Sequence, residues 1–261
     1  MTAWRLVACP LLTKEEVEII VGELDCTPEA LQNLAALLSD AERARAARFK
    51  FEIHRRRYIV TRGRLRLLLA ERLDAAPESI EIACRSHGKP ILGGRFVECG
   101  LHFNLSHTEN VAVYAFADRR EVGIDIEAVR ELWDMDSIAA GVFSPREHEA
   151  YLNLEASERA LGFFNCWTRK EAFVKALGDG LRYPLDSFEV SLSPGQQAKL
   201  LRVGDMPGDS CAWTLDDFTF GDNYVGAVVT QKQPMSRSDR GAAGLPRSRR
   251  FLRSQFSGLI K

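Results

Sequence analysis

The sequence has no dominant charge and no closely paired cysteines, and each absence excludes a class of protein. Lys and Arg total 35 against 36 Asp and Glu, so overall charge does not favour nucleic acid or a membrane surface as the partner. None of the six cysteines forms a CxxC pair, which argues against a zinc ribbon or a CxxC redox site.

Long apolar runs are also missing. No run approaches the roughly 18 residues of a membrane span, and Met1 is not followed by the basic and apolar regions of a secretion signal. We therefore expect a cytoplasmic protein whose thiols are reduced and mostly buried. With 261 residues, 46% of them hydrophobic, the chain can form one large domain or two smaller ones.

The first part of the chain is helical in pattern and basic. Helix formers dominate 28–74, and Leu65, Leu69 and Leu73 recur at every fourth position, so we expect two helices there. The basic residues fit either a solvated helical face or an anion site. They are Arg43, Arg45, Arg48, Lys50, Arg55, Arg56, Arg57, Arg62, Arg64 and Arg66.

The rest of the chain alternates short strands with helices. Ser144, Pro145 and Glu147 form the pattern of a capping box, so a helix should start at Ser144. A second helix is expected over 158–176 and should stop at Gly178. Strands are expected at 80–84, 103–105, 111–117, 121–127, 187–192, 212–220 and 224–230.

The last segment, 232–261, has eight basic residues and one acidic residue and shows no apolar period. Such a composition cannot bury enough apolar surface to order itself. We expect a disordered basic tail outside the fold.

The most informative local pattern is Gly123-Ile124-Asp125-Ile126-Glu127. On a strand, Asp125 and Glu127 project from one face, where two adjacent carboxylates repel each other. A divalent cation with a preference for oxygen ligands, Mg²⁺ or Mn²⁺, would relieve that repulsion. An ordinary exposed acidic pair is the alternative.

Two further patterns are ambiguous when taken alone. On a helix, Trp167, Lys170, Glu171 and Lys175 should share a face, as a functional cluster or as an ordinary surface pair of Glu171 with Lys175. The stretch 104–108 is expected to be a polar turn, and its histidine either satisfies the turn or binds an anion.

In order along the chain, these elements resemble the Sfp-type 4'-phosphopantetheinyl transferases over roughly residues 39–230. The resemblance implies an α+β pseudodimer of two similar subdomains, each a small antiparallel sheet packed by helices, with the active site between them. We expect subdomains at 1–118 and 119–231, a tail at 232–261, and a monomer. The matching motifs are Gly88-Lys89-Pro90, 103–107, 123–127, 143–147, 167–175, Gly180-Leu181 and 184–188.

The resemblance also implies an activity. Such enzymes transfer the 4'-phosphopantetheine arm of coenzyme A to a serine hydroxyl of an apo acyl or peptidyl carrier protein and release adenosine 3',5'-bisphosphate. By motif, Asp125, Glu127 and Glu171 would bind Mg²⁺, with Mn²⁺ as a substitute. Glu171 would be the general base, with Glu147 as a competitor, and Lys175 would act on a phosphate.

The coenzyme A contacts follow from the same motifs. One departure is Glu42, an acid where some relatives have a lysine near the 3'-phosphate, so Arg43 or Arg48 would replace that contact. The implied contacts are Arg45, Arg57, Lys89, Ser106, His107, Lys170 and Lys175.

Two other functions fit parts of the sequence. Another Mg²⁺-dependent phosphotransferase or nuclease could use the same acidic residues. A non-enzymatic RNA-binding protein could use the basic helices and tail, although the acidic residues would oppose it. We expect neither a nucleic acid nor a membrane partner. The sequence does not identify the carrier protein.

Overall fold

The computed structural model describes residues 5–6, 17–86, 88–178, 183–204 and 209–232, and the chain follows the same plan twice. The first half contains the strand β2 (Val17–Glu23), the helix α3 (Glu52–Leu73), a small hairpin and a long hairpin. The small hairpin is β3 (Ile82–Cys84) with β4 (Pro90–Leu92), and the long one is β5 (Leu101–Thr108) with β6 (Val111–Asp118).

The second half repeats this order. The strand β7 (Val122–Ala128) is followed by the helix α6 (Arg159–Leu177). Then come a small hairpin, β8 (Phe188–Val190) with β9 (Leu200–Val203), and a long one, β10 (Trp213–Phe220) with β11 (Tyr224–Gln231). In each half the first strand pairs with the last, giving the antiparallel orders β2-β6-β5 and β7-β11-β10. The expected pseudodimer of two α+β subdomains is therefore confirmed.

Each half also contains elements outside this repeated order. The strand β1 (Arg5–Leu6) pairs with the edge of β2. The helices α1 (Pro28–Ala36) and α2 (Asp40–Ala47) precede α3, and α4 (Met135–Val142) and α5 (Pro145–Leu152) precede α6. Short 3-10 helices lie at Pro77–Ser79, Gly94–Phe96, Ala156–Glu158, Leu185–Ser187 and Asp209–Ala212.

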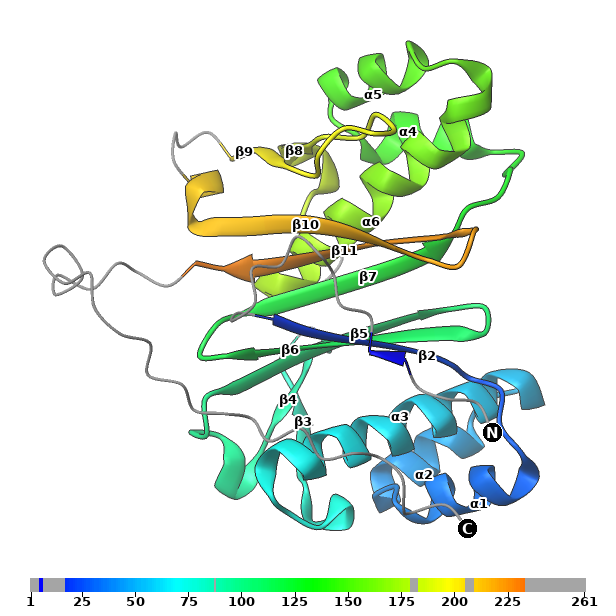
Figure 1. Cartoon of the computed structure of the whole chain (residues 1–261), viewed down its shortest axis with the longest axis vertical. Helices are drawn as coiled ribbons and strands as arrows, with labels where there is room; N and C mark the ends of the chain where they lie inside the picture. The colour runs from blue at the N-terminus through cyan, green and yellow to red at the C-terminus, as the bar shows by residue number, and fades with distance from the viewer. Residues whose placement is uncertain (1–4, 7–16, 87, 179–182, 205–208, 233–261) are drawn as a thin grey trace, which may run out of the picture.

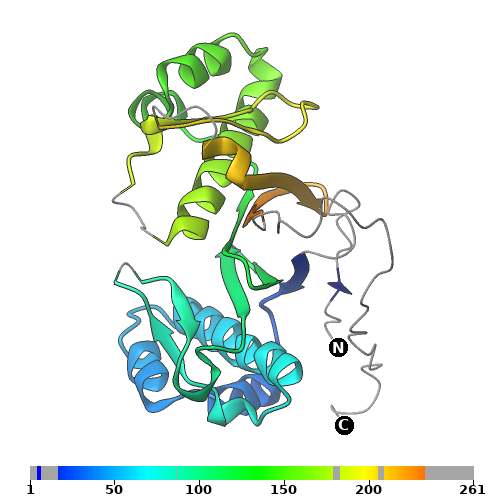
Figure 2. The ribbon, with the colours of Figure 1, turned by 90° about the vertical axis from the view of Figure 1, so that its left-hand side faces the viewer.

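The two sheets face each other between two layers of helices (Figure 1). Strand residues alternate between the faces, so Ile20 packs with Leu69 of α3 while Val113, on the other face, packs with Ile124 of β7. Figure 2 shows the helices of the two halves at opposite ends of the molecule, with the strands between them. Strands β5 and β7 therefore meet at the junction of the halves.

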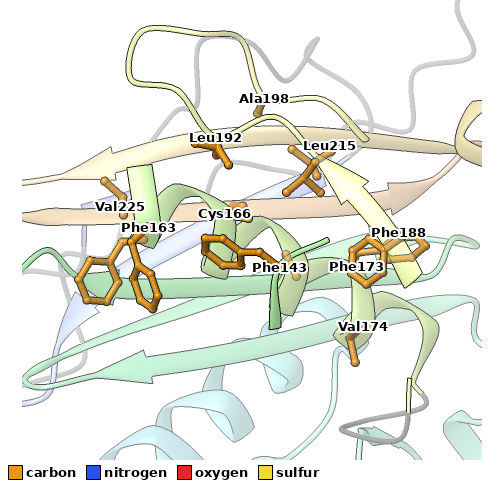
Figure 3. Close-up of a cluster of buried hydrophobic side chains, with 14 of the residues drawn as sticks. Phe143, Phe163, Cys166, Phe173, Val174, Phe188, Leu192, Ala198, Leu215 and Val225 are labelled. Atoms are coloured by element: carbon orange, nitrogen blue, oxygen red, sulfur yellow. The ribbon is translucent and has the colours of Figure 1, made fainter. Parts of the chain in front are cut away.

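The core of the second half is aromatic and surrounds α6 (Figure 3). Phe163 and Phe173 project from the helix and pack against Phe143 and Phe188. Gly123 of β7 lies so close to α6 that a Cβ there would be 2.1 Å from the carbonyl oxygen of Ala172. This contact fixes α6 directly over β7.

Several sequence predictions are confirmed by these elements. Ser144 caps α5 with the full capping box that includes Glu147, and Gly178 ends α6 in the left-handed conformation with a φ of 83°. Strands lie close to each expected position, and residues 221–223 form the turn between β10 and β11.

Three predictions about local structure were wrong. The stretch 28–74 forms three helices instead of two, because Ser39 and Glu42 make a capping box that starts α2. Residues 104–108 lie within β5, not in a turn. Of the described cysteines only Cys166 is buried, since others lie on an edge strand or in short surface segments. Cys26 is half-buried, and Cys84, Cys99 and Cys211 are exposed.

The described cysteines are all free thiols. No helix in the described ranges is both long and apolar enough to cross a bilayer. The expected disordered tail, from residue 233 onward, and Gly180-Leu181 lie outside the described residues.

Candidate active site

Side chains from β5, β7 and α6 form a hydrogen-bonded cluster at the junction of the two halves. Lys175 Nζ lies 2.6 Å from Asp125 Oδ1 and 3.0 Å from Ser106 Oγ, and the Ser106 hydroxyl donates to the same Asp125 oxygen at 2.7 Å. The three residues come from three separate sequence motifs. The fold thus unites two of these motifs from the second half with one from the first.

A second set of contacts aligns the two strands beside this cluster. The Thr108 hydroxyl donates to Glu127 Oε2 at 2.9 Å, and the Ile124 amide donates to Asn104 Oδ1 at 3.1 Å. Residues 104, 106 and 108 share one face of β5 because strand side chains alternate. That face is turned toward β7.

The carboxylates of Asp125, Glu127 and Glu171 act on one another electrostatically. Burial raises the pKa of Glu127, and the neighbouring Asp125 charge raises it further. Burial also raises the pKa of Glu171; Lys175 opposes this, while Asp125 and Glu127 add to it. Negative charge is therefore concentrated here beyond what Lys175 neutralises.

The donor set suits a hard cation such as Mg²⁺. All three groups are carboxylates, and Asp125 Oδ2 is buried without a hydrogen-bond partner in the described structure. Among the described residues, however, no group of three or more His, Cys, Asp or Glu side chains is arranged so that it could hold a metal ion. Magnesium sites in phosphoryl-transfer enzymes are commonly completed by water and substrate phosphates, so an open set of carboxylates remains compatible with this ion.

A pocket of about 280 Å³ adjoins the cluster, and both halves of the chain contribute to its wall. Lys175 belongs to both the cluster and the pocket. The remaining lining residues are Arg62, Gly88, Lys89, Pro90, Asn104, Leu105, Val174 and Gly178. The glycine-lysine-proline motif and the end of α6 therefore meet at one cavity.

Lys89 connects the glycine-lysine-proline motif to the end of α6. Its ammonium donates to Glu121 Oε2 at 2.7 Å and to the carbonyl oxygen of Ala176 at 2.9 Å. Burial lowers the pKa of Lys89, and its bond to Glu121 opposes that shift. These two bonds use two of the three donors of the ammonium, and the coenzyme contact of Lys89 stays a prediction.

Ser106 and His107, predicted to act together in one turn, point to opposite faces of β5. Leu105 packs in the cluster under α3, and the exposed His107, two residues along, lies on that same face. Ser106 faces β7. His107 is therefore separated from the carboxylates, although it lies on the same strand face as Leu105 of the pocket wall.

Arg45 and Arg57 both lie outside the lining of the pocket. Arg45 is exposed, with its guanidinium 5.6 Å from the centre of the Tyr58 ring. Arg57 is half-buried, its Nε makes no hydrogen bond in the described structure, and its charge acts on Tyr224 of β11. The structure leaves both residues available to an anion but does not bring them to the cluster.

Comparison with known proteins identifies the family. The family model for the 4'-phosphopantetheinyl transferase superfamily matches residues 121–229, and that for the 4'-phosphopantetheinyl transferase N-terminal region matches residues 23–118. The 4'-phosphopantetheinyl transferase HetI of Nostoc sp. is 42% identical over 218 residues, covering 84% of this chain and 89% of HetI. This chain belongs to the 4'-phosphopantetheinyl transferase superfamily.

Two further members show lower sequence identity. The 4'-phosphopantetheinyl transferase psf-1 of Bacillus pumilus is 33% identical, covering 77% of this chain and 82% of psf-1. Sfp of Bacillus subtilis is 28% identical, covering 66% of this chain and 74% of Sfp. The protein is accordingly an enzyme, a 4'-phosphopantetheinyl transferase.

Lys170 and Glu147, which the transferase motifs marked as functional, lie buried in the structure. Lys170 and Glu147 form an ion pair of 2.6 Å with side chains 1% and 2% exposed. The Lys170 ammonium also donates to the carbonyl oxygens of Leu185 and Phe188, and Glu147 accepts from the Val190 amide. Both side chains are buried and paired, which favours a structural role over the predicted coenzyme A contact of Lys170 and the predicted base role of Glu147.

The expectation that Trp167, Lys170, Glu171 and Lys175 share one helix face is wrong for the first two residues. Lys170 turns toward α5, and Trp167 stacks on Phe163 at 6.2 Å in the core. Glu171 and Lys175 remain at the junction. Within the described residues no hydrogen bond or ion pair engages the Glu171 carboxylate, whereas that of Glu147 is fully engaged.

The departure at Glu42 also has a structural explanation. Its Oε2 caps α2 through the Ser39 amide and pairs with the buried Arg66 Nε at 2.7 Å. Arg43, one of the suggested substitutes, pairs with Asp40 at 2.6 Å. Arg66 and Arg64 are buried, so the basic stretch is not simply a solvated face.

The sequence analysis did not single out two residues that the structure places at the pocket or at the boundary between the halves. Arg62 was one of ten basic residues in its stretch and was not considered separately from them. Glu121 anchors Lys89 and Arg85 at the boundary between the halves. The helical period from Leu65 and Leu69, carried back along α3, places Arg62 near the buried face, and this signal could have found it.

Proposed function

We propose that this enzyme transfers the 4'-phosphopantetheine arm of coenzyme A to a serine hydroxyl of an apo acyl or peptidyl carrier protein. The reaction would depend on Mg²⁺ and release adenosine 3',5'-bisphosphate. The observation that carries the proposal is the convergence of Ser106, Asp125 and Lys175 beside a pocket formed by both halves. Because one chain supplies all these groups, the proposed site needs no second copy.

The protein's own residues divide the work of binding and proton transfer. Lys175 lies partly exposed at the cluster, with its side chain 29% accessible, and would contact a pyrophosphate oxygen. Ser106 would orient Lys175 and Asp125. Bound Mg²⁺, held by Asp125, Glu127 and Glu171, would neutralise the charge that develops on the phosphates.

Glu171 is the better candidate for the general base. Its carboxylate has no bonded partner in the described structure, whereas Glu147 is buried in its pair with Lys170. The carrier serine oxygen would bond to the phosphorus that bears pantetheine while the phosphoanhydride bond to adenosine 3',5'-bisphosphate breaks. Glu171 would take the hydroxyl proton.

The proposal is tested by intact-mass measurement of apo carriers from fatty-acid, polyketide and nonribosomal-peptide systems. Incubation with the enzyme, coenzyme A and Mg²⁺ should add one phosphopantetheine group to at least one carrier. A carrier whose acceptor serine is replaced by alanine should stay unmodified, and a chelator should prevent modification. If no carrier gains the group while a nucleotide or RNA is cleaved, the alternative Mg²⁺-dependent activity is correct.

A further inference from the structure

Three cationic side chains line the pocket beside the cluster: Arg62, Lys89 and Lys175. Two of them already have anionic partners. Lys89 pairs with Glu121 at 2.7 Å, and Lys175 pairs with Asp125 at 2.6 Å. Their charges are neutralised by the protein itself.

Arg62 differs from both lysines. Its Nη1 is buried and makes no hydrogen bond in the described structure, and no carboxylate of the described residues forms an ion pair with it. A buried donor without a partner is costly, and a bound ligand is one of the explanations for such a donor in a native protein. Arg62 therefore lines the cavity and carries one donor that the described residues leave unused.

The surroundings hold this guanidinium in place without neutralising it. Arg62 lies 5.8 Å from the centre of the Tyr58 ring, one turn earlier on α3, and the same ring is 5.6 Å from Arg45. The next residue, Gly63, allows close packing of α3 on α1, since a Cβ there would lie 2.8 Å from Leu34. The positive charge is thus preorganised on a firmly packed helix.

We propose that Arg62 binds a phosphate group of coenzyme A and is a further coenzyme-binding residue of this enzyme. The inference rests on the proposed function. A guanidinium binds phosphate oxygens through two parallel donors, Arg62 lines the pocket, and its Nη1 has no hydrogen-bond partner among the described residues. Coenzyme A carries a pyrophosphate and a 3'-phosphate, and either supplies this chemistry.

The thermal stability of an Arg62 variant distinguishes a ligand-binding role of Arg62 from a purely structural one. If the side chain only fills space and stabilises the fold, Arg62→Gln should lower the thermal midpoint of the free enzyme. If it is kept for a ligand, removing an unpartnered charge beside Arg45 should leave the midpoint unchanged or raise it. The stabilisation that coenzyme A adds on binding should shrink in the same variant.

The test is calorimetric titration of coenzyme A and 3'-dephospho-coenzyme A into four forms of the full chain: wild type, Arg62→Gln, Arg62→Lys and Arg55→Gln. Arg55 is the matched control, because it lies on the same helix, is exposed and pairs with Glu52 at 2.8 Å. Arg62→Gln should bind coenzyme A roughly tenfold more weakly or worse, as expected for the loss of a charge-assisted bond. Arg62→Lys should recover part of the affinity, and Arg55→Gln should match wild type.

The two ligands identify the phosphate. If Arg62→Gln weakens binding of coenzyme A but not of its dephospho form, Arg62 binds the 3'-phosphate. An equal loss for both ligands assigns it to the pyrophosphate. Unchanged affinity of Arg62→Gln for coenzyme A, with wild type binding normally, overturns the inference alone. If wild type itself binds no coenzyme A, the proposed function fails.

Discussion

The ammonium of Lys175 on α6 lies 2.6 Å from Asp125 Oδ1 on β7, and Gly123 lies against α6 on the same strand. The close packing of β7 on α6 at Gly123 therefore places Asp125 beside Lys175, and the ion pair in turn helps to hold the helix against the strand. The side chain of Asp125 is 5% exposed, so its charge depends on Lys175 and Ser106 for compensation.

The mutual dependence predicts energetic coupling. Asp125→Asn and Lys175→Gln should each destabilise the fold, and the double variant should lose less than the sum, with a coupling of about 1 to 3 kcal/mol. Urea unfolding of the four forms measures this cycle. Additive losses would show that the contact contributes nothing to stability.

Gly123 should tolerate no side chain. A Cβ would lie 2.1 Å from Ala172 O and 2.3 Å from Ala176 N, both backbone atoms of α6 that cannot move independently. We expect Gly123→Ala to destabilise the enzyme by roughly 3 kcal/mol or more. Gly141 of α4 is the control, since a Cβ there meets nothing within 4 Å; Gly141→Ala should be neutral or stabilising by up to about 1 kcal/mol.

The Lys170–Glu147 pair should behave as a structural element. Lys170→Met leaves Glu147 buried without its cation, and we expect a loss of about 3 to 5 kcal/mol at pH 7. Burial already raises the pKa of Glu147, with Lys170 opposing the shift, so removing Lys170 should raise this pKa further. The protonated form is then favoured in the folded state, and the loss should shrink as the pH falls toward 5.

Transfer activity separates this structural role from catalysis. At a temperature where Lys170→Met is folded, its activity should follow the folded fraction. A variant of full stability and abolished activity would restore the catalytic assignment for the pair.

Glu121 should make the folded enzyme less stable as the pH falls. Burial raises the pKa of Glu121, but hydrogen bonds from His102, Lys89 and Arg85 outweigh it and hold the pKa far below the ordinary 4.5. The stabilisation is therefore complete above pH 4.5 and is lost as the pH falls below it. Glu121→Gln should cost roughly 2 kcal/mol at pH 7, and less at pH 3, by urea unfolding. An equal cost at both values would contradict the assigned charge.

Local signals in the sequence predicted part of the fold well. The capping box at Ser144, the glycine stop at Gly178 and the alternation around Asp125 all depend on neighbours within a few residues. The strand β2 (Val17–Glu23) was not predicted. Its run of Val and Ile residues carries a local strand signal that the sequence analysis did not use.

Part of the site could also be predicted from local sequence periods. Asp125, Glu171 and Lys175 lie on regular elements whose faces can be counted from the sequence. The engagement of Lys170 by Glu147 depends on where α5 packs, which no helical period reveals. The separation of Ser106 from His107 followed from strand alternation once 104–108 proved to be strand.

The most direct test of the account compares Asp125→Asn with wild type in the intact-mass assay of carrier modification. Asp222, exposed in the turn between β10 and β11, provides the matched control Asp222→Asn. We predict that wild type and Asp222→Asn add phosphopantetheine to the carrier at similar rates, and that folded Asp125→Asn does so at least about a hundredfold more slowly. Modification by Asp125→Asn at a rate near that of wild type would contradict the claim that this cluster performs the transfer.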